Sequence, residues 1–131
     1  MNGSQHLIDV RIAKLWLDDE DIIRIDFKDT EHHQIADARE IVAAHNEISK
    51  GAKKAVLADI RDVTTGANRE ARRYYVSPEA SEYKLAMAML VRSPLQRMLG
   101  NVFFFINHPP YPSRLFGDPD QAKQWLKEFQ S

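Results

Sequence analysis

The 131 residues fit one domain with a single hydrophobic core, since 44% of them are hydrophobic and 28% are charged. The formal net charge of −1, from 18 basic and 19 acidic residues, argues against nucleic acid as a partner. The absence of cysteine excludes disulfides, thiolate nucleophiles and Cys-ligated metals. No apolar run approaches the ~20 residues that span a bilayer and the start lacks a signal-peptide pattern, so we expect a cytoplasmic protein that is not transmembrane.

The spacing of apolar residues predicts strands and helices in alternation along the chain. A period of two marks a strand at 22–27, and Ser93-Pro94-Leu95-Gln96 has the capping pattern of a helix start. We expect strands at 11–17 and 22–27, a helix at 37–49, a strand at 55–60, a helix at 68–76, a strand at 85–91, a helix at 94–106, a strand at 113–116 and a helix at 118–129. This order predicts an α/β domain over residues 11–131, with a single mixed β-sheet of about five strands covered by helices. Residues 1–10 are expected to form a loose lead-in.

Several stretches carry a family resemblance. They are S-P-L-Q-R-M-L-G-N-V-F-F at 93–104 and P-P-Y-P-S-R-L-F at 109–116, with supporting matches at 56–59, 71–74 and 122–126. Together they resemble bacterial proteins of unknown function that are grouped with STAS domains, the fold of anti-sigma-factor antagonists, and with the related SEC14-like set. The resemblance covers residues 11–129. It implies a STAS-like fold, and this branch has no established activity.

One departure from the STAS pattern concerns phosphorylation. Typical antagonists carry Asp-Ser-Ser-Gly or Asp-Ser-Thr-Gly after the central strand, and a kinase phosphorylates one hydroxyl. The corresponding stretch here is Asp62-Val63-Thr64-Thr65-Gly66, in which valine stands where the acid is expected. Thr64 and Thr65 are candidates for a phosphorylation switch that is read near Arg69. The alternative is structural: Thr65 caps the next helix and Gly66 eases the turn.

Arginines are the candidates for binding an anion or an acidic partner. Three of them lie on one side of the helix at 68–76, opposite its tyrosines, and the others sit at or just beyond strands. Ligands of open α/β sheets gather at the carboxyl ends of the strands. The alternative is that these side chains are solvated or paired with nearby acids. The candidates are Arg61, Arg69, Arg72, Arg73, Arg92 and Arg114.

The helix at 94–106 has two distinct sides. One side, which we predict to face the core, carries Leu95, Met98, Leu99, Val102, Phe103 and Ile106. Phe104 lies on the opposite side with Arg97 and Asn101, where a large aromatic ring needs a cover. These three residues are therefore a candidate interface, for example in a homodimer. The alternative is that the helix ends before Phe104 and its ring folds into the core.

Catalytic patterns are missing from the sequence. There is no Gly-x-Ser-x-Gly elbow, no phosphate-binding loop and no compact histidine spacing, and His45 lies on an apolar helical stripe that favours a core position. We predict no catalytic residue, metal or cofactor. The leading hypothesis is a non-enzymatic STAS-like interaction module, a homodimer that binds a protein through residues 61–73. The alternative is a SEC14-like carrier of a small anionic ligand or lipid headgroup, using the strand-end arginines and Phe103 to Phe105.

Overall fold

The computed structural model describes residues 7–131, so most of the predicted lead-in lies outside the described residues. The strands are β1 (Ile8–Asp9), β2 (Ala13–Leu17), β3 (Ile22–Phe27), β4 (Lys54–Asp59), β5 (Lys84–Leu90) and β6 (Ser113–Phe116). The helices are α1 (Ile35–Ser49), α2 (Arg69–Tyr75), α3 (Pro78–Ser81), α4 (Pro94–Asn107) and α5 (Pro119–Lys127). Within this range, no helix is long and apolar enough to cross a membrane.

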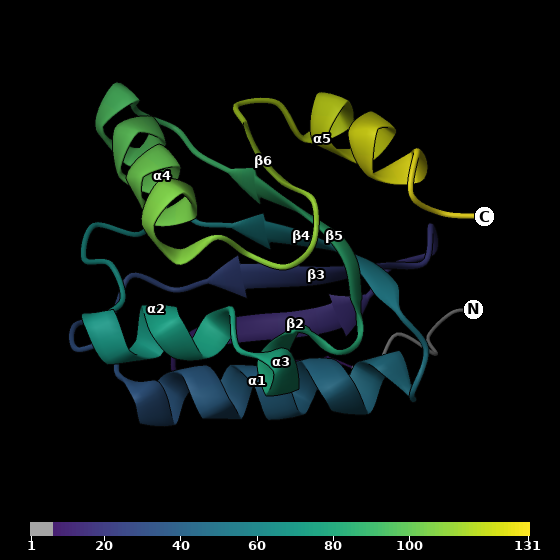
Figure 1. Cartoon of the computed structure of the whole chain (residues 1–131), viewed down its shortest axis with the longest axis horizontal. Helices are drawn as coiled ribbons and strands as arrows, with labels where there is room; N and C mark the ends of the chain where they lie inside the picture. Colours follow the sequence, from purple (N-terminus) through teal and green to yellow (C-terminus); the bar gives the residue numbers. More distant parts are fainter. Residues whose placement is uncertain (1–6) are drawn as a thin grey trace.

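All six strands form one sheet in the order of the chain, from β1 to β6. β1, β2 and β3 are antiparallel neighbours, whereas β3, β4, β5 and β6 run parallel to one another. A helix connects each parallel pair, so the carboxyl ends of these four strands lie at the same edge (Figure 1). This mixed sheet confirms the predicted fold class. It has one strand more than expected because the short segment Ile8–Asp9 pairs with β2.

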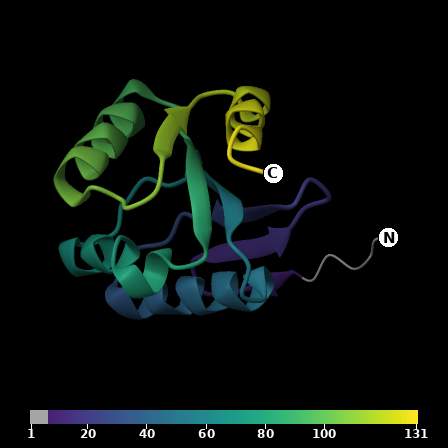
Figure 2. The same ribbon diagram turned by 45° about the vertical axis from the view of Figure 1, so that its right-hand side comes forward.

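The sheet separates two apolar layers. Helices α1, α2 and α4 cover one face, and α5 covers the other (Figures 1 and 2). On the first face, Ile23 and Val56 pack with Ile41 of α1. On the second face, Leu57 packs with Leu126 of α5. Alternate side chains of a strand point to opposite faces of the sheet, so β4 contributes to both layers. It is therefore apolar on both faces.

The amino end of α1 is fixed by an ion pair between a half-exposed arginine and a buried carboxylate. The Arg11 guanidinium donates to both carboxylate oxygens of Asp37, at 2.6 and 2.7 Å. Asp37 also accepts a hydrogen bond from the backbone of Gln34, which caps the helix. These hydrogen bonds, the one from Arg11 above all, lower the pKa of Asp37 to about 2. The clamp joins the turn before β2 to the first turn of α1.

Candidate functional site

The orientation of α4 reverses the prediction made from its sequence. Gly100 is its buried residue, and a Cβ placed there would lie 2.9 Å from Cδ2 of Leu115 on β6. The helix therefore packs against β6 at Gly100, where the missing side chain allows a close approach. The predicted core stripe instead faces solvent, apart from the half-buried Phe103. This prediction was wrong because an apolar stripe has the same spacing whether it faces its own sheet or another surface.

The exposed stripe on α4 is an unusual surface for a domain of this size. Its side chains are between 46 and 77% exposed, and we call them the α4 seam: Leu95, Met98, Leu99, Val102, Phe105 and Ile106. These fractions correspond to roughly 700 Å² of mostly apolar surface, above the few hundred Å² that a soluble monomer ordinarily exposes in one patch. A contiguous patch of this size is typical of a docking surface.

The three residues predicted as an interface lie beside the α4 seam. Arg97 and Asn101 are exposed, on the flank of α4 away from Leu99. Phe104 is half-buried and lies edge-on to Phe103, with ring centroids 5.7 Å apart. Phe104 is thus covered in part by its own chain. The greater apolar exposure belongs to the seam, and all of its residues except Phe105 were predicted to face the core.

A hollow of about 430 Å³ opens at the carboxyl ends of β4, β5 and β6. Its walls come from the end of each strand and from the first turn of α4. The lining residues are Arg61, Val91, Arg92, Ser93, Pro94, Arg97 and Gly117, and we call this site the arginine hollow. The structure thus brings together two predicted arginines, Arg61 and Arg92, and adds Arg97, which had been assigned to an interface.

The guanidiniums of the arginine hollow differ in how they are paired. Arg61 donates through Nε and Nη2 to the two oxygens of Asp59, at 3.0 and 2.8 Å. Burial alone would raise the pKa of Asp59. The hydrogen bonds from the side chain and backbone of Arg61, together with the charges of Arg61 and Arg24, outweigh burial and lower this pKa. Arg92 pairs with Asp62 at 3.2 Å, and both side chains are largely exposed. Among the described residues, no acidic side chain forms an ion pair with Arg97.

Gln96 holds the walls of the arginine hollow together. Its side-chain amide donates to the carbonyls of Ile60 and Val63, each at 2.9 Å, and its oxygen accepts the Arg92 backbone N–H at 2.7 Å. Ser93 caps α4 by accepting the Gln96 backbone N–H. The ends of β4 and β5 and the start of α4 therefore keep fixed relative positions.

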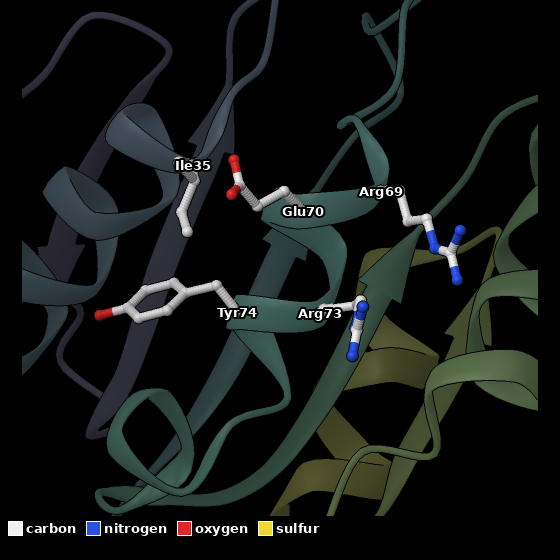
Figure 3. A pocket seen from close by; sticks show the side chains of 5 residues that line it. All are labelled: Ile35, Arg69, Glu70, Arg73 and Tyr74. Atoms are coloured by element: carbon white, nitrogen blue, oxygen red, sulfur yellow. The ribbon is translucent and has the colours of Figure 1, made fainter.

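A second, more open hollow of about 670 Å³ lies over α1 and α2. Figure 3 shows Arg69 and Arg73 extending side by side away from α1, whereas Glu70 and Tyr74 point toward Ile35. Two like charges four residues apart on a helix repel each other mildly, and an anionic partner would relieve this repulsion. This hollow is separate from the one that contains Arg61 and Arg92.

Two predicted arginines lie in neither hollow. Arg72 turns back and donates through Nη1 to the Ala67 carbonyl at 2.6 Å. Arg114 lies over the ring of Phe116, with its Cζ 5.1 Å from the ring centroid. The six arginines therefore do not form one continuous rim. They divide into two pairs of ligand candidates and two side chains that contact their own chain.

The loop with the two candidate threonines is held by the neighbouring loop. Thr64 donates to Oδ1 of Asp29 through its backbone N–H at 2.9 Å and through its hydroxyl at 2.8 Å. These two bonds lower the pKa of Asp29. Thr65 is exposed, and Asn68, not Thr65, caps α2 by accepting the Ala71 N–H. The predicted structural role of Thr65 as a helix cap was therefore wrong.

Two acidic groups lie in register at the same sheet edge. Asp26 on β3 is paired in register with Asp59 on β4, and burial together with the charge of Asp59 raises the pKa of Asp26. Between residues 7 and 131, no group of three His, Cys, Asp or Glu side chains is arranged to hold a metal ion.

A protein of known structure has a similar fold. An uncharacterised protein of the DUF3478 family with a SpoIIAA-like fold, from Shewanella loihica PV-4, superposes with a TM-score of 0.57 at 13% identity. The match covers 94% of this chain and 92% of that chain, and at this identity it shows the fold alone. SpoIIAA-like is the STAS-like architecture predicted from the sequence.

Other comparisons concern the family. A protein of unknown function from Arthrobacter sp. FB24 is 24% identical over 86% of this chain and 97% of that chain, with a TM-score of 0.31, too low to support an argument from structure. No curated protein matches the sequence. A family model described as "Domain of unknown function (DUF7793)" matches residues 15–130. The chain therefore belongs to the DUF7793 family.

Proposed function

We propose that this chain is a non-enzymatic, STAS-like interaction module, and that the α4 seam binds a second copy of the same chain. The observation that carries the proposal is the outward position of an apolar helical stripe, with Gly100 in contact with the sheet in its place. A protein gains nothing from exposing so much apolar surface unless a partner covers it.

The spacing of the seam favours another helix as the partner. Leu95, Met98 and Leu99 recur one heptad later as Val102, Phe105 and Ile106. Side chains at such spacing interdigitate with those of a second helix that crosses at a shallow angle. About a two-fold axis perpendicular to α4, the seam would meet an identical seam running in the opposite direction, so each end of the helix would contact the other end of its copy.

Charge and area support a second copy over a charged partner. Helix α4 contains no acidic residue, and its one cation, Arg97, lies outside the seam. Two seams would therefore meet without opposing like charges. Burial of roughly 700 Å² on each copy is close to the ~800 Å² per partner of a standard interface.

The experiment is to measure the molar mass of the full chain by light scattering after size exclusion. We expect about twice the chain mass of 15.1 kDa for the wild type, and the mass of one chain for Phe105→Glu and Met98→Glu. Gln124→Glu, an equal charge change at an exposed position of α5, is the matched control and should leave the dimer intact. A wild type that stays monomeric at about 100 µM would overturn the proposal, because an interface of this area gives micromolar or tighter binding.

The carrier hypothesis has less support. A carrier of an apolar ligand encloses its cargo in a cavity with mainly apolar walls. The two hollows described above are open to solvent, and arginines contribute to the walls of both. Phe105, which the carrier hypothesis uses, is 77% exposed on the α4 seam.

A further inference from the structure

We propose that the arginine hollow binds a small phosphorylated ligand. Arg97 and Arg92 donate hydrogen bonds to the phosphate, and Arg61 lies beside it. This inference is independent of the proposed dimer, because none of these arginines belongs to the α4 seam.

The first reason is the position of the hollow. It lies at the carboxyl ends of three adjacent parallel strands, where open α/β sheets commonly bind ligands. Its volume of about 430 Å³ falls within the usual range for small-molecule sites and exceeds what a bare phosphate needs. Space therefore remains for an organic group beside the phosphate.

The second reason is the uneven neutralisation of the three arginines. Asp59 holds Arg61 through two hydrogen bonds, so this guanidinium is fixed in place. The side chains of Arg92 and Asp62 are 65 and 76% exposed, and a pair so open to water contributes little. A phosphate would replace Asp62 at small cost and would also give Arg97 its missing counter-charge. Guanidiniums suit this role because they donate paired hydrogen bonds to phosphate oxygens.

The third reason is that the walls are already in position. Gln96 ties the β4 end, which carries Arg61, to the first turn of α4, and its oxygen binds the backbone of Arg92. A ligand would therefore order few additional groups on binding, which lowers the entropic cost. The cap at Ser93 also directs the amino end of α4 toward the hollow, where the helix dipole adds a favourable field for an anion.

Gly117 offers a way to fill the site without removing an arginine. A Cβ at this position would lie 3.7 Å from Nη2 of Arg97 and would clash with nothing. The backbone there lies outside the left-handed region, so a side chain is tolerated. In Gly117→Asp the new carboxylate would thus pair with Arg97 and compete with any bound phosphate.

The experiment is an NMR titration of the full chain with inorganic phosphate and with phenyl phosphate, each compared with chloride at equal ionic strength. For a five-atom anion we expect saturable amide shifts at 61, 92–93, 95–97 and 117 with a dissociation constant of about a millimolar. Tighter binding of phenyl phosphate would identify a phosphate ester as the ligand class, and equal binding would identify free phosphate.

Three variants test the assignment. Arg97→Gln should weaken phosphate binding about tenfold or more, since it removes a charged hydrogen-bond donor. Gly117→Asp should weaken binding to a similar degree with all arginines present. Arg114→Gln, at the same sheet edge but stacked on Phe116, is the control and should bind as the wild type does. Shifts scattered over the surface, or an unchanged affinity in both Arg97→Gln and Gly117→Asp, would overturn the proposal. Light scattering on the same samples reports the dimer separately, so either proposal can fail alone.

Discussion

Acid should destabilise this protein through one buried imidazole, His45 on α1. The side chain is fully buried, its Nδ1 lies 2.9 Å from Oδ1 of Asn46, and its Nε2 has no hydrogen-bond partner within the described part of the chain. Burial, together with the positive charge of Lys84, lowers the pKa of His45 from 6.5 to about 4. The folded state therefore resists protonation at pH values where the unfolded chain already accepts a proton.

The sign and size of the effect follow from this difference in pKa. The unfolded state takes up the proton near pH 6.5 and the folded state near pH 4, so stability is greatest above 6.5 and falls as the pH drops toward 4. At about 1.4 kcal/mol per pKa unit, the full loss is about 3 kcal/mol, of which about 2 kcal/mol is reached at about pH 5. Such a loss is a large part of the free energy of unfolding of an ordinary domain.

Urea unfolding followed by circular dichroism, at several pH values, measures this loss. His45→Leu lacks the titrating group, so between about pH 7 and about pH 5 it should lose about 2 kcal/mol less than the wild type does. His32→Asn is the control: His32 has an exposed side chain and a φ of 61°, which asparagine tolerates, and this variant should follow the wild type. Parallel pH curves for the wild type and His45→Leu would refute the reasoning, because every other titrating group is shared.

Three further predictions concern α4, the start of α1 and the threonine loop. Gly100→Ala should destabilise the protein by about 1 kcal/mol, because overpacking against Leu115 outweighs the gain in helix propensity. The control Asn101→Ala, at an exposed position of the same helix, should not destabilise it. Chemical denaturation measures the free energy of unfolding of both variants. Asp37→Asn should lower the free energy of unfolding by about 1–2 kcal/mol at neutral pH. This difference from the wild type should vanish as the pH falls from 3.8 toward 2, because the native carboxylate is then protonated. Urea unfolding at several pH values across that range measures it. Phosphorylation of Thr64 would place negative charge against Asp29, so hydrogen exchange of residues 60–68 should speed up several-fold, and unchanged protection would speak against loop opening.

The strands and helices could be read from the sequence because their periods differ clearly. Ile23, Ile25 and Phe27 alternate with polar residues, and β3 occupies 22–27 as predicted. Apolar runs bounded by Pro or Gly fixed the limits of β5 and α4 to within one residue. Local spacing therefore sufficed for the fold class. The pairing of Ile8–Asp9 with β2 involves too few residues to leave such a pattern.

The α4 seam could not be predicted in this way, because periodicity gives the position of an apolar stripe and not what covers it. The useful signal was Gly100, a glycine inside a helix, which often marks a close approach of the backbone to another element. The opposite side of α4, which carries Gln96 and Asn107, would otherwise have been assigned to solvent. Gln96 lies at the junction of α4 with the end of β4.

The arginine hollow required knowledge of the topology. Arg61 and Arg92 are 31 positions apart in the sequence and meet because Asp59 and Leu90 are register partners at the ends of β4 and β5. Arg97 joins them because α4 starts directly after β5. The pairing of Arg61 with Asp59, two residues away, was one of the alternatives that the sequence left open.

Helix α4 thus contributes to both the arginine hollow and the α4 seam, one of them charged and the other apolar. Its first turn contributes Arg97 to a site where charge is unevenly neutralised, while its outer side is apolar over its whole length. A ligand on the arginine hollow would contact the end of the helix and leave the seam free. Since Gln96 and Gly100 fix α4 on the strand ends and on β6, the helix can dock a partner without moving relative to the hollow. The fold therefore permits a dimer whose two anion sites are occupied or empty independently of its assembly.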